Sequence, residues 1–240
     1  MSSLTDFKNI SNSNVELVRI TTDTHTIWEK STSRLPDTYQ EVEWIQAQNN
    51  AYINTNYSLQ SNELKIQTRL KGTLTSNEQD LIGNQDYSTN RFVIGVYQNC
   101  FFGYPRSGNN LEGNVVTSAY SSEIDEELEA GFSISNHSKY IKTTINGSTT
   151  TATNSMYHNI SQSNNKIQLF ANGASGGYFS SMKLYYMKIT DNNTLVRDYV
   201  PCYEKTGSQR IGLYGLVNDT FYPNNGTGTF TKGADIGGGT

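Results

Sequence analysis

The sequence predicts an all-β protein, a sandwich or jelly roll built from many short strands. The 240-residue chain contains 16 tyrosines and 20 glycines and is rich in threonine, serine and asparagine. Tyrosine and threonine favour strands, whereas glycine and asparagine supply the turns between them. Strand-like runs also recur about every ten residues, and helical spacing is almost absent. Aromatic residues make up 11% of the chain, which is enough to bury a core despite the polar composition.

The N-terminal stretch predicts a small β-hairpin. Two strand-like runs, 15–20 and 25–30, are joined by the four residues TTDT, a length that suits a hairpin loop. Val18, Ile20 and Trp28 would form one apolar face. Because a lone hairpin is only marginally stable in water, this face needs something to pack on. Both the chain's own β domain and a neighbouring subunit remain open as that partner.

From Leu35 onward, alternation of apolar and polar residues predicts the strands of the main domain. They are expected over 63–71, 79–86, 91–98, 99–104, 138–154, 166–173, 178–189, 195–200 and 211–217. The clearest is the hairpin at 138–154, because Asn146-Gly147 is a strong tight-turn pair at its centre.

The closing segment, residues 194–232, carries the most specific pattern of the chain. In order it contains the words LVRD (195–198), VPC (200–202), GLY (212–214), LVN (216–218), FY (221–222) and GTGTF (226–230). This order resembles the end of laminin-G-like, concanavalin A-type lectin modules found in phage virion proteins and bacterial surface proteins. Leu35–Tyr39 and Glu41–Ile45 resemble the opening strand of the same modules.

The resemblance implies a fold and a division of the chain. The expected fold is a concanavalin A-like jelly-roll sandwich over 35–232, in which two sheets pack face to face. A hairpin segment, 1–34, would precede it as an attachment or docking device, and a Gly-rich tail, 233–240, would follow and be flexible if left free. Association of several copies, as a trimer or larger ring, is expected over a monomer.

Charge and hydropathy exclude several function classes. The net charge of −4 disfavours nucleic acid as a partner, since phosphate binding needs a positive surface. No apolar run is long enough for membrane insertion. The N-terminus lacks the features of a secretory signal peptide. We therefore expect synthesis in a host cytoplasm, with exposure outside the cell as a virion component.

Cysteines and histidines give no sign of a metal site. Cys100 and Cys202 are expected to be reduced core residues, although a disulfide would need only a short Cα separation. His25, His137 and His158 are scattered without ligand spacing. No compact acidic loop offers calcium several oxygens, so no cofactor is expected.

The run Glu123–Glu127 is the one candidate for catalysis. Period two would place Glu123, Asp125 and Glu127 on one face, as in glucanases of this fold, where two carboxylates cleave a glycosidic bond. Glu126 interrupts the pattern, because that position should be apolar. An acidic solvated loop or strand edge is the simpler interpretation.

A carbohydrate platform is the main binding hypothesis. Sugars present C–H faces to aromatic rings and hydroxyls to polar side chains. Alternation places Phe92, Ile94 and Val96 in the core and turns the intervening residues outward. The predicted carbohydrate-binding residues are Arg91, Tyr97, Tyr104, Arg106 and Asn109. Alternatively, the two tyrosines only cover a sheet surface or contact another subunit.

The resemblance favours a non-enzymatic structural or adhesion protein of a phage particle, on a tail, baseplate or capsid exterior. Its partners would be other virion proteins, copies of itself and host cell-surface glycans. The alternative is a glycan hydrolase on the same fold that uses Glu123 and Glu127. A bacterial adhesin would require a secretion signal or wall anchor.

Overall fold

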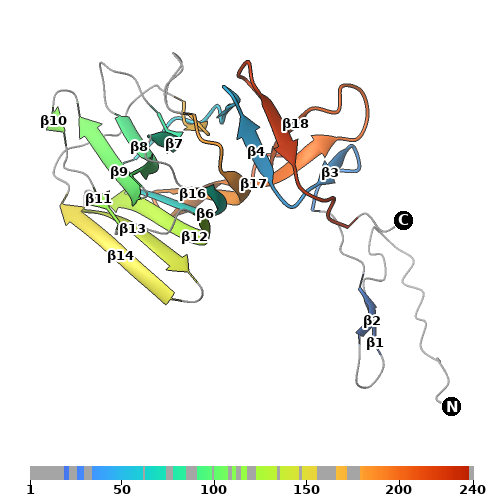
Figure 1. Ribbon diagram of the computed structural model, residues 1–240, viewed down its shortest axis with the longest axis horizontal. Helices are drawn as coiled ribbons and strands as arrows, with labels where there is room; N and C mark the ends of the chain where they lie inside the picture. Colours follow the sequence, from blue (N-terminus) through green and yellow to red (C-terminus); the bar gives the residue numbers. More distant parts are fainter. Residues whose placement is uncertain are drawn as a thin grey trace.

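The protein is all-β, as the sequence predicts (Figure 1). The computed structural model describes residues 19–21, 26–29, 34–61, 63–73, 78–84, 91–98, 100–107, 110–111, 115–117, 123–133, 136–145, 148–155, 166–171 and 179–237. Within these ranges the chain forms strands, bridges and turns and no helix, and hence no helix that could span a membrane.

The strands form two antiparallel sheets and one separate hairpin. The smaller sheet has the order β10-β9-β8-β7-β15-β5, with β11 beside β9. The larger sheet has the order β14-β13-β12-β6-β16-β17-β18-β19, with β3, β4 and β20 attached. The smaller sheet comprises β5 (Ile53–Asn54), β7 (Gln79–Gly83), β8 (Arg91–Tyr97), β9 (Cys100–Ser107), β10 (Asn110–Leu111), β11 (Val115–Val116) and β15 (Gln168–Leu169). The larger sheet comprises β3 (Tyr39–Glu41), β4 (Ile45–Gln48), β6 (Glu63–Thr73), β12 (Glu123–Ser133), β13 (Ser138–Ile145), β14 (Ser148–Ser155), β16 (Lys183–Asp191), β17 (Thr194–Glu204), β18 (Ile211–Gly215), β19 (Thr220–Pro223) and β20 (Thr229–Lys232).

The core lies between the inner faces of the two sheets. Ile66 and Leu70 of β6 and Phe132 of β12 belong to it, together with Phe92 of β8 and Phe101 of β9. The rings of Phe92 and Phe132 meet edge to face, with centroids 5.7 Å apart, and so join one sheet to the other. This arrangement is a jelly-roll sandwich, the fold class that the sequence predicts.

Strand β8 departs from the simple alternation expected of it. Phe92, Ile94 and Val96 are buried in the core as predicted. Val93 and Gly95 are buried too, with Val93 0% exposed, although alternation should turn them to solvent. The middle of β8 is therefore covered on both faces, and it offers no exposed platform there.

The N-terminal hairpin is present as its own two-stranded sheet (Figure 1). Strand β1 (Arg19–Thr21) pairs with β2 (Thr26–Glu29), and Ile20 lies opposite Trp28. Residues directly opposite one another share a face, which agrees with the predicted apolar pairing. Val18 and the side chains of both strands lie outside the described residues. Docking through this hairpin therefore stays a prediction.

The C-terminal tail is joined to the sandwich more closely than expected. After β20, the backbone N–H groups of Gly233 and Ile236 donate to the carbonyl oxygens of Trp44 and Glu41, both at 2.9 Å. Residues 233–236 are thus not left free, because their backbone pairs with residues 41–44 between β3 and β4.

The start of the main domain is also anchored. Leu35 is buried with Val200, Cys202 and Tyr214 in a second, small apolar cluster. Immediately before it, the Arg34 guanidinium pairs with the buried carboxylate of Glu41 at 2.5 Å. Arg34, assigned from the sequence to the hairpin segment, therefore contacts the sandwich.

Both cysteines are free, as expected. Cys202 is fully buried, and burial, with Glu41 and Glu204 nearby, raises the pKa of its thiol. Cys100 is only half-buried and lies at the start of β9, so it is not the core residue that the sequence suggested.

Candidate functional site

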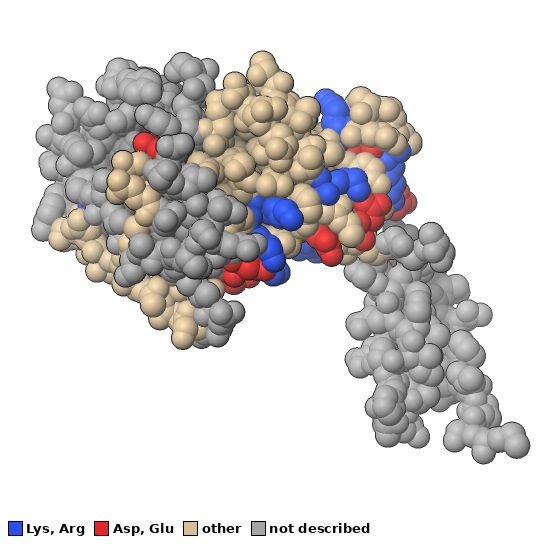
Figure 2. Space-filling model, viewed as in Figure 1, with Lys and Arg blue, Asp and Glu red and all other residues tan. Residues whose placement is uncertain are grey.

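Polar side chains gather on the outer face of the larger sheet. In β6, Leu64, Ile66, Thr68 and Leu70 are buried, while Lys65, Gln67 and Arg69 between them are half-exposed. The same alternation turns polar residues of β12, β13 and β16 outward. The outward residues on these four strands include Lys65, Gln67, Arg69, Lys71, Asp125, Glu127, Glu129, Tyr140, Lys142, Tyr186 and Lys188. Figure 2 shows basic and acidic side chains lying next to one another on the molecule.

A β-bulge places two consecutive tyrosines on this outer face. Leu184 of β16 lies opposite Leu70, but the next paired residue is Tyr186, opposite Arg69. The extra residue, Tyr185, is left without a partner in the ladder, which is what a bulge does. Its ring lies under the Arg69 guanidinium, 4.4 Å from the guanidinium carbon. Both tyrosines are half-buried.

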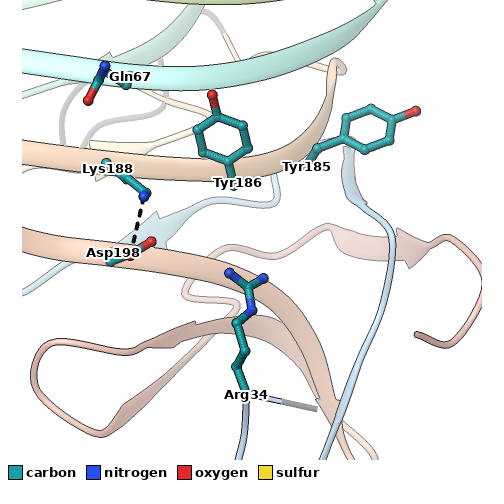
Figure 3. A pocket seen from close by; sticks show the side chains of 6 residues that line it. All are labelled: Arg34, Gln67, Tyr185, Tyr186, Lys188 and Asp198. Atoms are coloured by element: carbon teal, nitrogen blue, oxygen red, sulfur yellow. Dashed lines mark ion pairs between the residues drawn. The ribbon is translucent and has the colours of Figure 1, made fainter. Parts of the chain in front are cut away.

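An open pocket of about 290 Å³ lies beside this tyrosine pair (Figure 3). It is lined by Arg34, Gln67, Tyr185, Tyr186, Lys188 and Asp198. Figure 3 shows Arg34 approaching from the segment before β3, while the other residues come from β6, β16 and β17. The Lys188 ammonium lies 3.7 Å from a carboxylate oxygen of Asp198. We call this the tyrosine pocket.

Asp198 contributes an acceptor to the tyrosine pocket. One of its carboxylate oxygens, Oδ2, faces Lys188. The other, Oδ1, is buried and has no hydrogen-bond donor among the residues that the structure describes. A buried acceptor without a donor is costly, so the accessible acceptor that Asp198 offers at the pocket is Oδ2.

Two carboxylates beside the pocket are held by tyrosine hydroxyls. Tyr186 donates to Glu127, and Tyr140 donates to Glu129 at 3.2 Å. Glu129 also accepts from the Gln67 amide at 3.0 Å. Burial, reinforced by the neighbouring carboxylates, raises the pKa of both tyrosines. They therefore remain protonated donors at neutral pH.

Basic residues on this face have acidic partners. Asp125 pairs with Arg69 at 3.0 Å and with Lys71 at 3.2 Å. Partial burial acts to raise the pKa of Asp125, but hydrogen bonds from Lys71 and Arg69 outweigh it and lower the pKa. The pocket cations are also paired, Lys188 with Asp198 and Arg34 with Glu41. The charges of these four cations, Arg34, Arg69, Lys71 and Lys188, are thus locally balanced.

The acidic run of the sequence lies on β12, a strand in the interior of the larger sheet between β6 and β13. The run is thus a strand and not a loop, but only Glu127 of its five residues pairs with both neighbours, so 123–126 lie along a local edge, in line with the strand-edge interpretation. Asp125 and Glu127 share the exposed face, as period two predicts, and Leu128 begins the buried face. The side chains of Glu123 and Glu126 lie outside the described residues.

The predicted carbohydrate residues fall on the β8–β9 hairpin. Arg91 lies opposite Arg106, and Tyr104 lies opposite the buried Val93. Tyr97 is 46% exposed, but it lies at the other end, opposite Cys100. Six residues of strand separate Tyr97 from Arg91, roughly 20 Å, so one sugar unit cannot contact both. The side chains of Arg91, Tyr104 and Arg106, and all of Asn109, lie outside the described residues.

Sequence reasoning missed the tyrosine pocket. Its residues come from β6, β16 and β17 and from Arg34, and strand pairing that brings such distant segments together cannot be read from one sequence. A local signal was present, since Tyr185-Tyr186 between two apolar residues breaks the period of two and indicates a bulge. Among the described residues, no three histidine, cysteine or acidic side chains are grouped as metal ligands would be.

Known proteins share this fold without close sequence similarity. No protein-family model matches the sequence, and no curated protein matches it. A Bacteroides ovatus protein proposed to bind carbohydrate has a TM-score of 0.55 at 12% identity, over 82% of this chain and 62% of its own. The heptameric SAP-like pentraxin of Limulus polyphemus has a TM-score of 0.53 at 11% identity, over 85% of this chain and 97% of its own.

A third solved structure is the enzymatically active domain of tailspike protein 2 from bacteriophage CBA120. It has a TM-score of 0.51 at 6% identity and covers 65% of this chain. This chain matches only 29% of the tailspike chain's length. At such identities the three structures establish the fold alone, which is a jelly-roll β-sandwich like that of lectin-type modules.

Proposed function

We propose that this protein is a non-enzymatic carbohydrate-binding module whose ligand occupies the tyrosine pocket. The observation that carries the proposal is the bulge that sets Tyr185 and Tyr186 side by side at the pocket. Aromatic rings offer apolar faces to the C–H faces of sugars. Around them, Gln67, Lys188 and Asp198 supply donors and acceptors for hydroxyl groups.

We further propose that the module belongs to a structural or adhesion protein of a phage particle, on a tail, baseplate or capsid exterior. The resemblance of residues 194–232 to phage lectin-like modules supports this, and a phage tailspike domain shares the fold. Its partners are then other virion proteins, copies of itself and host surface glycans. Mass spectrometry of purified particles tests the location, because a virion protein is recovered at stoichiometric amounts and a contaminant is not.

A glycan hydrolase is the weaker alternative. The middle carboxylate of its acidic run, Asp125, is tied to Arg69 and Lys71, and Glu127 accepts from Tyr186. These contacts suit a binding surface better than a pair of mobile acids and bases. Release of reducing ends from wall polysaccharide, abolished in Glu127→Gln, would establish hydrolysis and overturn the non-enzymatic proposal.

A glycan array tests the binding site directly. The intact protein should retain a defined subset of glycans, and Tyr185→Ala and Tyr186→Ala should each weaken this binding by about 0.5–1.5 kcal/mol, the contribution of a stacking ring. Tyr203→Ala is the matched control, since Tyr203 also donates to a carboxylate, that of Asp235, but lies outside the pocket. An array on which the intact protein binds no glycan would reject the function.

A further inference from the structure

The tyrosine pocket is too small to hold more than a short piece of a glycan. Its volume of about 290 Å³ lies at the lower end of the range for small-molecule sites. The pocket is open to the sheet surface, so a longer ligand must continue along that surface.

A row of polar side chains leads away from the pocket across the strands. Asp198 lies opposite Lys188, Lys188 opposite Gln67, Gln67 opposite Glu129, and Glu129 opposite Lys142. The five residues come from β17, β16, β6, β12 and β13 in turn, and all are half-buried. Four strand spacings cover roughly 19 Å. We call this the polar row.

The far end of the polar row has its own aromatic ring. Tyr140 of β13 donates to Glu129, and the same carboxylate accepts from Gln67 of the pocket. Tyr140 is half-buried, so part of its ring faces solvent. Three strand spacings separate β13 from β16, roughly 14 Å. A ring at each end and hydrogen-bonding groups between them match a chain of sugar units.

The charges along the row favour an uncharged ligand. The two cations of the pocket, Lys188 and Arg34, are paired with Asp198 and Glu41. The row itself carries two acidic residues, Asp198 and Glu129, and two basic ones, Lys188 and Lys142, so its charges balance. An anionic glycan would therefore have to displace existing ion pairs, whereas hydroxyl groups can share these acceptors and donors.

We infer that the site binds a neutral oligosaccharide of several units, which crosses the strands from the tyrosine pocket to Tyr140. This inference rests on the proposed function and names its ligand class and a second subsite. Tyr140 contacts the distal units only, and the Tyr140–Glu129–Gln67 hydrogen bonds position them relative to the pocket.

The test is a chain-length series measured by isothermal titration calorimetry. The probes are neutral oligosaccharide ladders of glucose, mannose, galactose and N-acetylglucosamine, from single sugars to hexamers, with oligogalacturonate as the acidic counterpart. Affinity should rise with chain length in the intact protein. Tyr140→Phe should lower the affinity for long chains about fivefold, the effect of one hydrogen bond, and leave the affinity for the shortest bound ligand unchanged. Tyr203→Phe, which removes a hydroxyl bonded to Asp235, is the control and should change neither.

Salt dependence tests the neutral character of the ligand. Affinity should change less than about twofold between 0.1 M and 1 M salt, over which the Debye length falls from about 10 Å to about 3 Å. Affinity that is independent of chain length, or preferential and salt-sensitive binding of oligogalacturonate, would overturn this inference while leaving carbohydrate binding intact. Failure of every neutral ladder to bind would also overturn this inference, whereas the proposed function itself is rejected only if the array shows no bound glycan.

Discussion

The Arg69 guanidinium lies over the ring of Tyr185, with 4.4 Å between the guanidinium carbon and the ring centroid. The same guanidinium pairs with Asp125 at 3.0 Å, so a neighbouring strand fixes the cation. Because Tyr185 is the bulged residue of β16 and lacks a ladder partner, this contact holds the ring at the pocket. The β-bulge at Tyr185 and the contact with Arg69 together set the position of one aromatic ring of the proposed binding surface.

Arg69→Ala should weaken glycan binding even though Arg69 is not a lining residue of the tyrosine pocket. Without the cation, the Tyr185 side chain has more conformational freedom, and losing that freedom when the ligand binds lowers the affinity. A cation–π contact at a partly exposed site contributes about 0.5–1 kcal/mol. Titration with the best ligand of the array measures the loss. Lys232→Ala is the control, because Lys232 lies over Tyr203 and pairs with Asp235 in the same manner elsewhere. An equal loss in the two variants would contradict the positioning role.

The ion pair with Glu41 ties Arg34 to the sandwich. A chain that begins at Arg34 should be about as stable as the complete protein, whereas Arg34→Ala should cost about 1–3 kcal/mol, because it strips a partner from the buried carboxylate of Glu41. Urea unfolding of both proteins measures the difference. If Arg34→Ala leaves the midpoint unchanged, the pair is only a surface contact.

Of Gly72 and Gly131, which both lie on the larger sheet, Gly131 should tolerate substitution by alanine less well. A Cβ at Gly131 would collide with the carbonyl oxygen of Leu64 on β6, whereas a Cβ at Gly72 would meet Met182 at an ordinary 3.5 Å. We expect Gly131→Ala to destabilise the protein by roughly 1–3 kcal/mol, and Gly72→Ala to have little effect. Thermal unfolding compares the two, and equal melting temperatures would contradict the close approach of β12 and β6.

Low pH should lower the free energy of unfolding because Glu204 becomes protonated. Hydrogen bonds from Arg210 lower the pKa of Glu204 to about 2. Since the folded-state pKa lies below the ordinary value, the ionised group stabilises the fold above about pH 4.3. This contribution is lost as the pH falls toward 2. The gap in unfolding free energy between the intact protein and Arg210→Gln, about 1 kcal/mol at neutral pH, should therefore close at low pH. A gap that stays constant from pH 7 to about pH 2 would contradict this linkage.

The sequence predicted the strands better than the site. Alternation correctly placed β6, β8 and the pair β13–β14, because each carries a clear period of two or a hairpin pattern. It could not show that Val93 is covered on the outer face of β8, since that depends on what packs there. Nor could it show that residues 233–236 pair with the segment before β4. These hydrogen bonds are made by backbone groups, which almost every residue has, so the side chains do not indicate the pairing.

The site escaped prediction for the same reason. Gln67, Glu129 and Lys188 are adjacent only because β6 lies between β12 and β16, and that order depends on long-range pairing. The predicted platform instead used residues close in sequence, and the hairpin register separates Tyr97 from Arg91 along the strand. Local composition led to a platform on the smaller sheet, whereas the pocket that the structure shows lies on the larger one.

The most direct measurement is a crystal structure of the protein with the best array ligand bound. Sugar rings are expected at Tyr185 and Tyr186, with hydroxyls within hydrogen-bonding distance of Asp198 Oδ2 and Gln67 and further units directed toward Tyr140. A glycan seated instead beside Tyr97 on the smaller sheet, with the tyrosine pocket empty in the same crystal, would contradict the central claim.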